Sequence, residues 1–269
     1  MAPVVYRLID GNFLRSLCES LSQEIGFEFW AALDWTYITK GDRTFIYDSL
    51  PAKKPSQSDT EFQANFDARL ADLDRLRRLP NVFVKDGFSR FRKKVGQEQK
   101  GVDILLATDA ILFAHRGIAD ELHIYTNDLD FFPVFEALQS TSCRGRLFHS
   151  PEKPPNDLLP FTDSAEAVRI NLLLEACGVG WGHSNSIYTL GAGVAGETPF
   201  LVGESIHSGA FEMRFYSIER SFEVKYFINS RCEFLITKSP VLAYGIAEKF
   251  MKNVPAMLLS TLRGFLSKP

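Results

Sequence analysis

The sequence Thr126-Asn127-Asp128-Leu129-Asp130-Phe131-Phe132-Pro133 lies between two apolar runs. The run before it, 121–125, is typical of a short buried strand, and the run after it, 134–138, begins a helix. The two aspartates therefore lie at the carboxyl end of a strand, where open α/β sheets bind their ligands. Two carboxylates one residue apart repel each other and favour the binding of a hard divalent cation. The alternative is that Asp128 or Asp130 only caps the following helix.

The composition is that of a globular protein with a sizeable core. The chain has 269 residues, 45% of them hydrophobic, which is enough for one large domain or two ordinary ones. A formal net charge of -3 gives no global attraction for nucleic acid, so phosphate binding requires a local basic patch. The four cysteines form no Cys-x-x-Cys pair, which argues against a zinc site or a disulfide framework and fits a reducing, cytoplasmic compartment. We expect no signal peptide and no transmembrane helix.

Strands and helices alternate over the first half of the chain. Apolar or β-branched runs predict strands at 4–9, 43–48, 82–84, 121–125 and 146–150, and helical spacing predicts helices at 13–25, 61–79 and 102–115. This alternation predicts an α/β domain with a mostly parallel, five-stranded sheet and helices on both faces. The carboxyl ends of parallel strands share one edge of the sheet. We therefore expect Asp10, which ends the first strand, and Asp103, which begins a helix, to converge there with Asp128 and Asp130.

A basic segment precedes the third of these helices. Residues 88–99 are expected to form a loop that contains Arg90, Arg92, Lys93 and Lys94, and Lys100 follows. In most proteins such a run is only a solvated surface. Here it leads directly to the acidic edge of the sheet. A phosphodiester substrate needs this combination, with cations for its phosphates and a metal at its scissile bond.

The second half has a different pattern. Residues 151–162 form a proline-rich connection that we interpret as a linker after a domain at 1–150. Residues 163–175 are expected to form a helix, and from residue 198 alternating runs predict an antiparallel meander followed by helices. The sequence therefore predicts a smaller C-terminal α+β domain at 163–269.

Three blocks of the first half resemble the signatures of the NYN domain, a branch of the PIN-like nucleases that includes the LabA-like bacterial proteins. The blocks are Ile9–Asn12, Lys100–Ile104 with Ala107–Asp109, and Thr126–Pro133. The resemblance covers roughly residues 1–150. It implies a Rossmann-like sheet and metal-dependent cleavage of RNA. The central block reads Thr-Asn-Asp-Leu-Asp where the family usually has Ser-Gly-Asp-Ser-Asp, so its acids are kept.

The resemblance also implies roles for individual residues. The catalytic residues and ligands of Mg²⁺ or Mn²⁺ would be Asp10, Asp103, Asp128 and Asp130. Residues behind these ligands would be Asn12, Asp109, Thr126 and Asn127, with Asn12 orienting the site or a bound water and Thr126 donating hydrogen bonds at the metal edge. The phosphates of RNA would be held by Arg90, Arg92, Lys93, Lys94 and Lys100.

Two other interpretations stand beside the nuclease. A non-catalytic RNA-binding or regulatory adaptor would keep the acidic pocket as a relic and recruit a partner through the second half. A Toprim- or haloacid-dehalogenase-like phosphotransfer site would also place acids at strand tips. However, the first strand ends in Asp-Gly-Asn rather than Asp-x-Asp, and Toprim folds have Glu there. The second half resembles no family we know, and it is compatible with forming a homodimer, binding a protein partner, regulating the nuclease or binding the target.

Overall fold

The computed structural model describes residues 2–39, 42–53, 55–92, 96–151, 153–168, 170–184, 200–202, 205–206, 209–216, 221–228, 231–249, 254 and 256–266. Two compact units divide the chain: Met1–Leu17 with Trp35–Arg169, and Cys18–Asp34 with Ile170–Pro269. Within the described ranges, no helix is long and apolar enough to cross a lipid bilayer.

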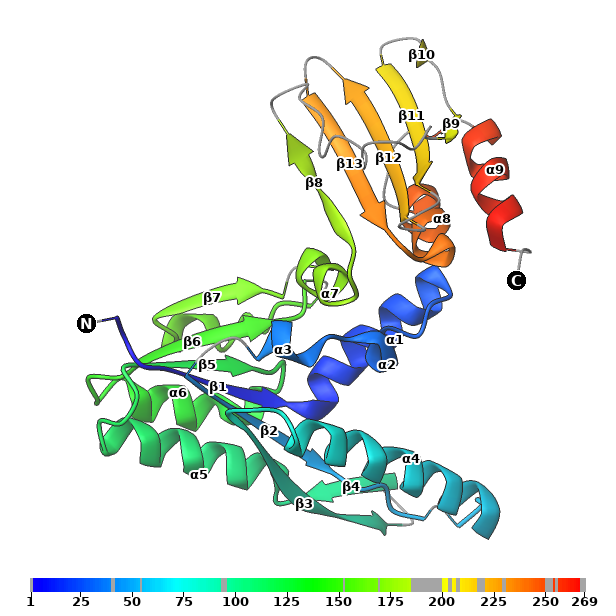
Figure 1. Ribbon diagram of the computed structural model, residues 1–269. Helices are drawn as coiled ribbons and strands as arrows, with labels where there is room; N and C mark the ends of the chain where they lie inside the picture. The colour runs from blue at the N-terminus through cyan, green and yellow to red at the C-terminus, as the bar shows by residue number, and fades with distance from the viewer. Residues whose placement is uncertain are drawn as a thin grey trace. The chain divides into compact units, whose positions relative to one another are not determined.

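The first unit is built on a sheet with the strand order β4-β3-β2-β1-β5-β6-β7 (Figure 1). The strands are β1 (Val5–Asp10), β2 (Arg43–Ser49), β3 (Val82–Arg92), β4 (Gly96–Lys100), β5 (Glu121–Tyr125), β6 (Arg144–His149) and β7 (Ser164–Ala167). All neighbouring strands are parallel except β3 and β4, which form an antiparallel hairpin. The predicted α/β fold with a mostly parallel sheet is therefore confirmed. The prediction of five strands is wrong, because β4 and β7 extend the sheet at its two edges.

The sheet continues past residue 150, where we expected the first domain to end. Residues 163–175 were expected to be helical, but β7 pairs in parallel with β6, with Ala165 opposite Leu147. The segment 151–162 also adds to this unit, because Leu158 is fully buried in its core and the short 3₁₀ helix η2 (Leu159–Phe161) packs against that core.

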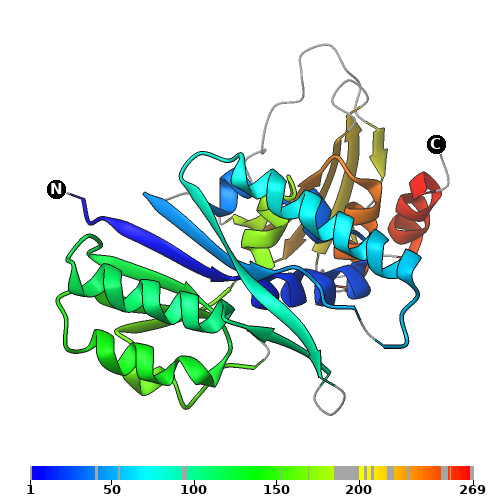
Figure 2. The ribbon, with the colours of Figure 1, turned by 90° about the horizontal axis from the view of Figure 1, so that it is seen from below.

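Helices cover both faces of the sheet. In β2, the Tyr47 hydroxyl donates a hydrogen bond to Asp109 on α5 (Val102–His115), whereas the next residue, Asp48, pairs with Arg69 on α4 (Asp59–Arg77). Successive side chains of a strand point to opposite faces, so α5 and α4 lie on opposite faces of the sheet. Figure 2 shows these two helices on either side of the strands.

Local sequence explains where these helices begin. Ser58 and Glu61 form a capping box at the start of α4: the Ser58 hydroxyl accepts from the Glu61 N–H at 3.2 Å, and the Glu61 carboxylate accepts from the Ser58 N–H at 3.1 Å. Gly101 precedes α5 with φ of 92°, a left-handed conformation that glycine adopts without strain. This turn places Asp103 in the first turn of α5, where the helix dipole favours a negative charge.

The main core lies between the sheet and the two helices α5 and α6 (Phe132–Leu138). It gathers fully or nearly fully buried side chains from these elements, including Leu8, Tyr47, Leu106, Leu122, Ile124, Phe135 and Leu147. Figure 1 shows α5 and α6 along the same side of the sheet. The buried apolar area of this cluster fixes α5 against β1 and β2, and so fixes the position of Asp103 at its amino end.

The second unit contains an antiparallel sheet with the order β10-β11-β12-β13-β8, in which β9 also pairs with β11. Its strands are β8 (Gly180–Ser184), β9 (Phe200–Val202), β10 (Ser205–Ile206), β11 (Gly209–Tyr216), β12 (Ser221–Ile228) and β13 (Arg231–Thr237). Its helices are α2 (Phe29–Ala32), α7 (Ile170–Ala176), α8 (Pro240–Lys249), α9 (Ala256–Leu266) and the later residues of α1 (Gly11–Ile25). Gly245 of α8 packs closely on Ile25, since a Cβ at position 245 would lie 2.4 Å from the Ile25 Cγ2.

Candidate active site

The strand order creates a switch point at the carboxyl ends of β1 and β5. The chain runs from β1 to β2 on one side and returns to pair β5 on the other side of β1. Loops leave the sheet in opposite directions at such a point, and ligands of open α/β sheets bind in the resulting crevice. Asp10 ends β1, and Thr126 follows directly after β5.

Asp10 is held by its own turn and by the end of β5. Its Oδ1 accepts backbone N–H groups from Asn12 at 3.0 Å and Phe13 at 3.3 Å. The Thr126 hydroxyl lies 3.4 Å from the Asp10 Oδ2, toward which it donates. Burial raises the pKa of Asp10 to about 6, and the nearby charges of Asp103 and Asp128 add to the rise against the pull of the two N–H groups. The Asn12 side chain itself is exposed, so the described contact of this residue is through its backbone.

Thr126 links the two strand tips. It is fully buried, and its hydroxyl also accepts from the Asp128 N–H at 3.1 Å. Asp128 in turn accepts from the Asp130 N–H at 2.9 Å and caps the 3₁₀ helix η1 (Leu129–Phe131). The capping alternative is thus realised for Asp128, but a cap uses only one of its two carboxylate oxygens. The Asp128 side chain keeps an oxygen that is available to a ligand.

Asp103 joins the same group from the first turn of α5. It is half-buried, and burial raises its pKa, with further contributions from the charges of Asp128 and Asp130. Because Asp128 also acts on Asp10, the three carboxylates of Asp10, Asp103 and Asp128 lie near enough to repel one another, and Asp130 repels Asp103. The contacts that the structure describes join Asp10 to Thr126, Thr126 to Asp128 and Asp128 to Asp130, and Asp103 begins the helix α5. Convergence of all four aspartates on one ion stays a prediction.

Two other predicted residues have different partners. Asp109 lies further along α5, where its Oδ2 accepts from the Tyr47 hydroxyl at 2.9 Å and lies 3.7 Å from the Lys85 ammonium. Asn127 anchors the chain that follows β6, since its side chain accepts from the Ser150 N–H at 2.9 Å and donates to the Lys153 carbonyl at 2.8 Å. Both residues fix elements that carry the acids, and their described contacts do not reach Asp10.

The acids do not form a closed coordination shell. In the part of the chain that the structure describes, no three His, Cys, Asp or Glu side chains lie close enough together to hold one metal ion. The donor chemistry nevertheless fits Mg²⁺ or Mn²⁺, because every acid at this edge offers carboxylate oxygen and the Thr126 hydroxyl lies beside them. Mg²⁺ usually keeps several waters and uses one or two carboxylates, so a partial set of protein ligands is compatible with it.

The prediction that residues 88–99 form a loop is wrong. The backbone of β3 continues to Arg92, and β4 returns beside it with Phe88 opposite Lys100. Arg90 and Arg92 therefore lie on a strand, and Lys100 ends the neighbouring strand just before Gly101 and α5. Lys93 and Lys94 lie outside the described residues. The structure gives the backbone, but not the side-chain contacts, of the other three.

Sequence reasoning missed a fifth acid, Asp48, which lies near the end of β2 beside the β1 tip. It is only 1% exposed, and its Oδ1 accepts from the Arg69 guanidinium at 2.5 Å and from the Ser49 N–H at 2.7 Å. Burial raises the pKa of Asp48 to about 7, and the charges of Asp10 and Asp86 add to the rise. The signal was the same as for Asp10, an acid that ends an apolar strand, but nothing local showed that it would be buried.

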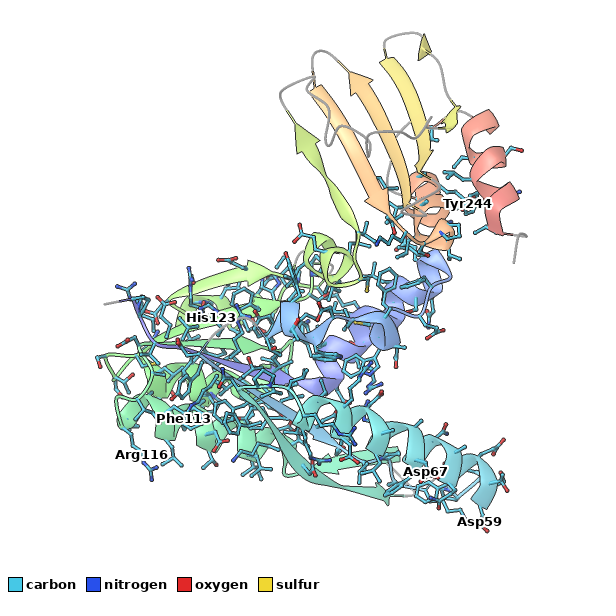
Figure 3. All side chains as sticks on the ribbon, viewed as in Figure 1. Asp59, Asp67, Phe113, Arg116, His123 and Tyr244 are labelled. Carbon is cyan, nitrogen blue, oxygen red and sulfur yellow. The ribbon has the colours of Figure 1, made fainter. Side chains whose placement is uncertain are left out.

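Figure 3 shows two ordinary surface acids for comparison, Asp59 and Asp67. Asp59 and Asp67 project from α4 into solvent, and Asp67 accepts a hydrogen bond from the Gln63 side chain at 2.8 Å on the same helix. Phe113 and Arg116 mark the carboxyl end of α5, which is the end far from Asp103. Asp67 therefore provides a control position for substitutions at the acidic edge.

One family model matches part of the first unit. Residues 54–167 match the family model of the NYN domain. This match confirms the resemblance drawn from the sequence, and it includes Asp103, Asp128 and Asp130, whereas Asp10 precedes the matched range. NYN domains are a branch of the PIN-like nuclease superfamily. No family model matches the C-terminal half.

One solved structure resembles part of the chain. It is a crystal structure of a protein of unknown function from Vibrio parahaemolyticus, 15% identical, with a TM-score of 0.43 over 63% of this chain and 94% of that one. No curated protein matches the sequence significantly.

Proposed function

We propose that the protein is a metal-dependent ribonuclease that hydrolyses RNA phosphodiester bonds at the carboxyl edge of the first sheet. The observation that supports this proposal is that the Thr126 hydroxyl joins Asp10, at the end of β1, to Asp128, after β5, at the switch point of an NYN-like sheet. Carboxylates from neighbouring strand ends at a ligand-binding crevice are a candidate cation site.

Each residue of the site has a role in this proposal. Asp10, Asp103, Asp128 and Asp130 would hold Mg²⁺ or Mn²⁺. A bound ion would supply a water that is acidic enough to attack phosphorus, together with positive charge at the leaving oxygen. Thr126 would keep the Asp10 carboxylate turned toward the crevice, because its hydroxyl donates toward the Asp10 Oδ2.

The supporting residues act through the elements that carry the acids. Asp109 would fix α5, and with it Asp103, through its hydrogen bond with Tyr47. Asn12 would orient the site or a bound water from the turn after β1, and Asn127 would fix the chain after β5. Arg90, Arg92 and Lys100 of the β3–β4 hairpin would hold the RNA phosphates, together with Lys93 and Lys94 of the sequence between its strands. The second unit would provide dimerisation, regulation or target binding, and the protein would act in the cytoplasm.

A second function is favoured by the open arrangement of the acids. Because no three described side chains form a preformed metal shell, a non-catalytic RNA-binding or regulatory adaptor fits the same fold. The two functions differ in one observable. The nuclease shortens RNA when Mn²⁺ is present and stops when EDTA removes the ion, whereas the adaptor binds RNA and leaves it intact.

The test is an incubation of a labelled pool of cellular RNAs with wild-type protein, Asp128→Asn and Asp67→Asn, with Mn²⁺ or with EDTA. Asparagine caps a helix as well as aspartate does, so Asp128→Asn keeps the cap of η1 and removes only the charge. We expect this variant to retain the wild-type melting temperature and to lose cleavage, while Asp67→Asn cleaves normally. Cleavage that survives EDTA or the Asp128→Asn substitution would contradict the proposed metal site.

A further inference from the structure

The acid that the sequence did not reveal, Asp48, is fixed in place from two sides. Its Oδ1 accepts from Arg69 of α4 and from the Ser49 N–H, and Arg69 also donates to the Ser49 carbonyl at 3.4 Å. The Asp48 side chain is fully buried, and the Arg69 side chain is 11% exposed. The ion pair therefore joins the end of β2 to α4 in a site that solvent barely reaches.

The other carboxylate oxygen of Asp48 has no donor among the described residues. The Oδ2 atom is buried and accepts no hydrogen bond there. A buried carboxylate oxygen without a donor is unfavourable, and apolar side chains usually fill such space at least as stably. Packing alone therefore does not explain an aspartate at this position.

The carboxylate packs directly against the turn that carries Asp10. A Cβ atom at Gly11 would lie 2.7 Å from the Asp48 Cγ and 2.8 Å from its Oδ2, closer than any real side chain permits. Any side chain at position 11 would therefore clash with Asp48, and the Gly11 backbone packs against the Asp48 carboxylate. The neighbours of Gly11 in the chain are Asp10 and Asn12, whose N–H holds the Asp10 Oδ1.

We propose that Asp48 is a positioning residue, which, held by Arg69, supports the Asp10-Gly11-Asn12 turn and so directs the Asp10 carboxylate toward a divalent cation. This inference rests on the proposed function, since it assumes that Asp10 binds the ion. Residues behind a metal ligand commonly change metal affinity by about 10–100-fold when they are replaced. The effect of Asp48 should therefore appear in metal affinity as well as in cleavage.

The experiment measures Mn²⁺ affinity in the absence of RNA, by the electron paramagnetic resonance signal of free Mn²⁺, for folded wild-type protein and variants. Asp48→Ala removes the support under Gly11, and we expect it to weaken Mn²⁺ binding by about tenfold or more. Asp48→Asn keeps the volume and can still accept from Arg69 and Ser49, so its affinity should stay near that of the wild type. Asp86→Ala is the matched control, because Asp86 is the register partner of Asp48 on β3 and pairs with Arg77.

A second substitution tests the same contact from the other side. Gly11→Ala adds the methyl group that meets the Asp48 carboxylate, and it should also weaken Mn²⁺ binding. If Asp48→Ala does not fold, Gly11→Ala takes its place as the test. If both fold, the double variant should bind Mn²⁺ more tightly than two independent losses would allow, since the methyl group then enters vacated space.

The outcomes separate this inference from the proposed function. If wild-type protein binds Mn²⁺ and cleaves RNA while Asp48→Ala, or Gly11→Ala in its place, keeps full affinity, the positioning role is overturned and the nuclease stands. If Asp48→Asn binds Mn²⁺ as weakly as Asp48→Ala does, the charge of Asp48 and not its contact with Gly11 sets the affinity, and the positioning role is overturned. If the wild type neither binds Mn²⁺ nor cleaves RNA, the proposed function fails and this inference fails with it.

Discussion

Asp10 carries a proton at a pH where an ordinary aspartate has lost it. Its folded-state pKa of about 6 lies above the ordinary value of 3.8 because the side chain is buried near Asp103 and Asp128. A group whose pKa is raised on folding binds its proton more tightly in the folded state. Its contribution to the unfolding free energy is therefore fully present below about pH 4 and is lost as the pH rises through about 6.

The raised pKa of Asp10 predicts how Asp10→Asn changes the free energy of unfolding of the metal-free protein. At pH 7.5 the substitution removes an ionised, poorly solvated carboxylate, and we expect it to stabilise the protein by about 1–2 kcal/mol, after allowance for partial exposure. The gain should shrink as the pH falls toward 4, where wild-type Asp10 is neutral. Urea unfolding of both proteins with EDTA at several pH values measures it. A gain that grows toward low pH would contradict a raised pKa.

At the residue scale, the sequence predicts which acids lie at the ends of strands and the starts of helices in the βα pattern. Asp10 and Asp128 follow strands, and Asp103 begins a helix, so their meeting at one edge follows from parallel pairing. Asp48 carried the same signal but was not selected, because its importance depends on Arg69, which is 21 residues away on another element. Burial and partner choice at that distance arise from tertiary packing, not from local pattern.

At the scale of elements, the hairpin and β7 show how pairing overrides local composition. Residues 88–100 are polar and basic, and Ser164–Ala167 has the sequence Ser-Ala-Glu-Ala, so neither has the β-branched alternation of a strand. Both became strands because a neighbour offered a free edge: β3 for β4 and β6 for β7. Strand propensity depends on such neighbours more than helix propensity does, which explains why α4 and α5 were predicted closely and these strands were not.

The Asp48–Arg69 pair gives a prediction for the contact of α4 with the sheet. Arg69→Met keeps the length of the side chain and removes the ion-pair partner of the buried Asp48 carboxylate, while the charge of Arg15 still acts on it. Removing one partner of a buried pair typically costs about 3–5 kcal/mol, and we expect a loss of that size in urea unfolding at pH 7.5. The loss should become smaller at lower pH, where the unpaired Asp48 takes up a proton.

A control on the same helix makes this test specific. Arg75 also lies on α4, and its guanidinium is 3.8 Å from Asp72 at a site where the Arg75 side chain is 42% exposed. Exposed pairs contribute about 0–1 kcal/mol, so Arg75→Met should change stability by no more than that. Equal losses in Arg69→Met and Arg75→Met would show that helix α4, rather than the buried pair, sets the effect.

At the scale of the whole molecule, the charge balance concentrates any attraction for RNA in one place. The formal net charge is -3, so the protein as a whole repels a polyanion weakly. The acidic edge repels it more strongly. Binding of RNA therefore requires a local basic surface. The β3–β4 hairpin, which leads into α5 and Asp103, carries Arg90, Arg92 and Lys100, and the sequence between its two strands adds Lys93 and Lys94, which lie outside the described residues.

The salt dependence of RNA affinity measures how many of these cations meet phosphates. Each contact to single-stranded nucleic acid lowers the logarithmic slope by about 0.7, so five contacts predict a slope of about -3.5. Arg90→Gln with Arg92→Gln should reduce the slope by about 1.4 and leave Mn²⁺ affinity unchanged, because neither residue is a proposed ligand. Fluorescence anisotropy with a labelled RNA and the Asp128→Asn background, which prevents cleavage, gives the slope between low and moderate salt.

The control for this measurement is Arg144→Gln. Arg144 begins β6, at the opposite end of the parallel strands from the acidic edge, and its side chain is 72% exposed. Arg144→Gln removes one charge and the hairpin variant removes two, so a purely global effect of charge would make the change of slope in Arg144→Gln about half of that in the hairpin variant. A slope that is unchanged by the hairpin substitutions but reduced by Arg144→Gln would move the RNA path away from the hairpin. Arg90 and Arg92 would then have no part in holding the RNA phosphates.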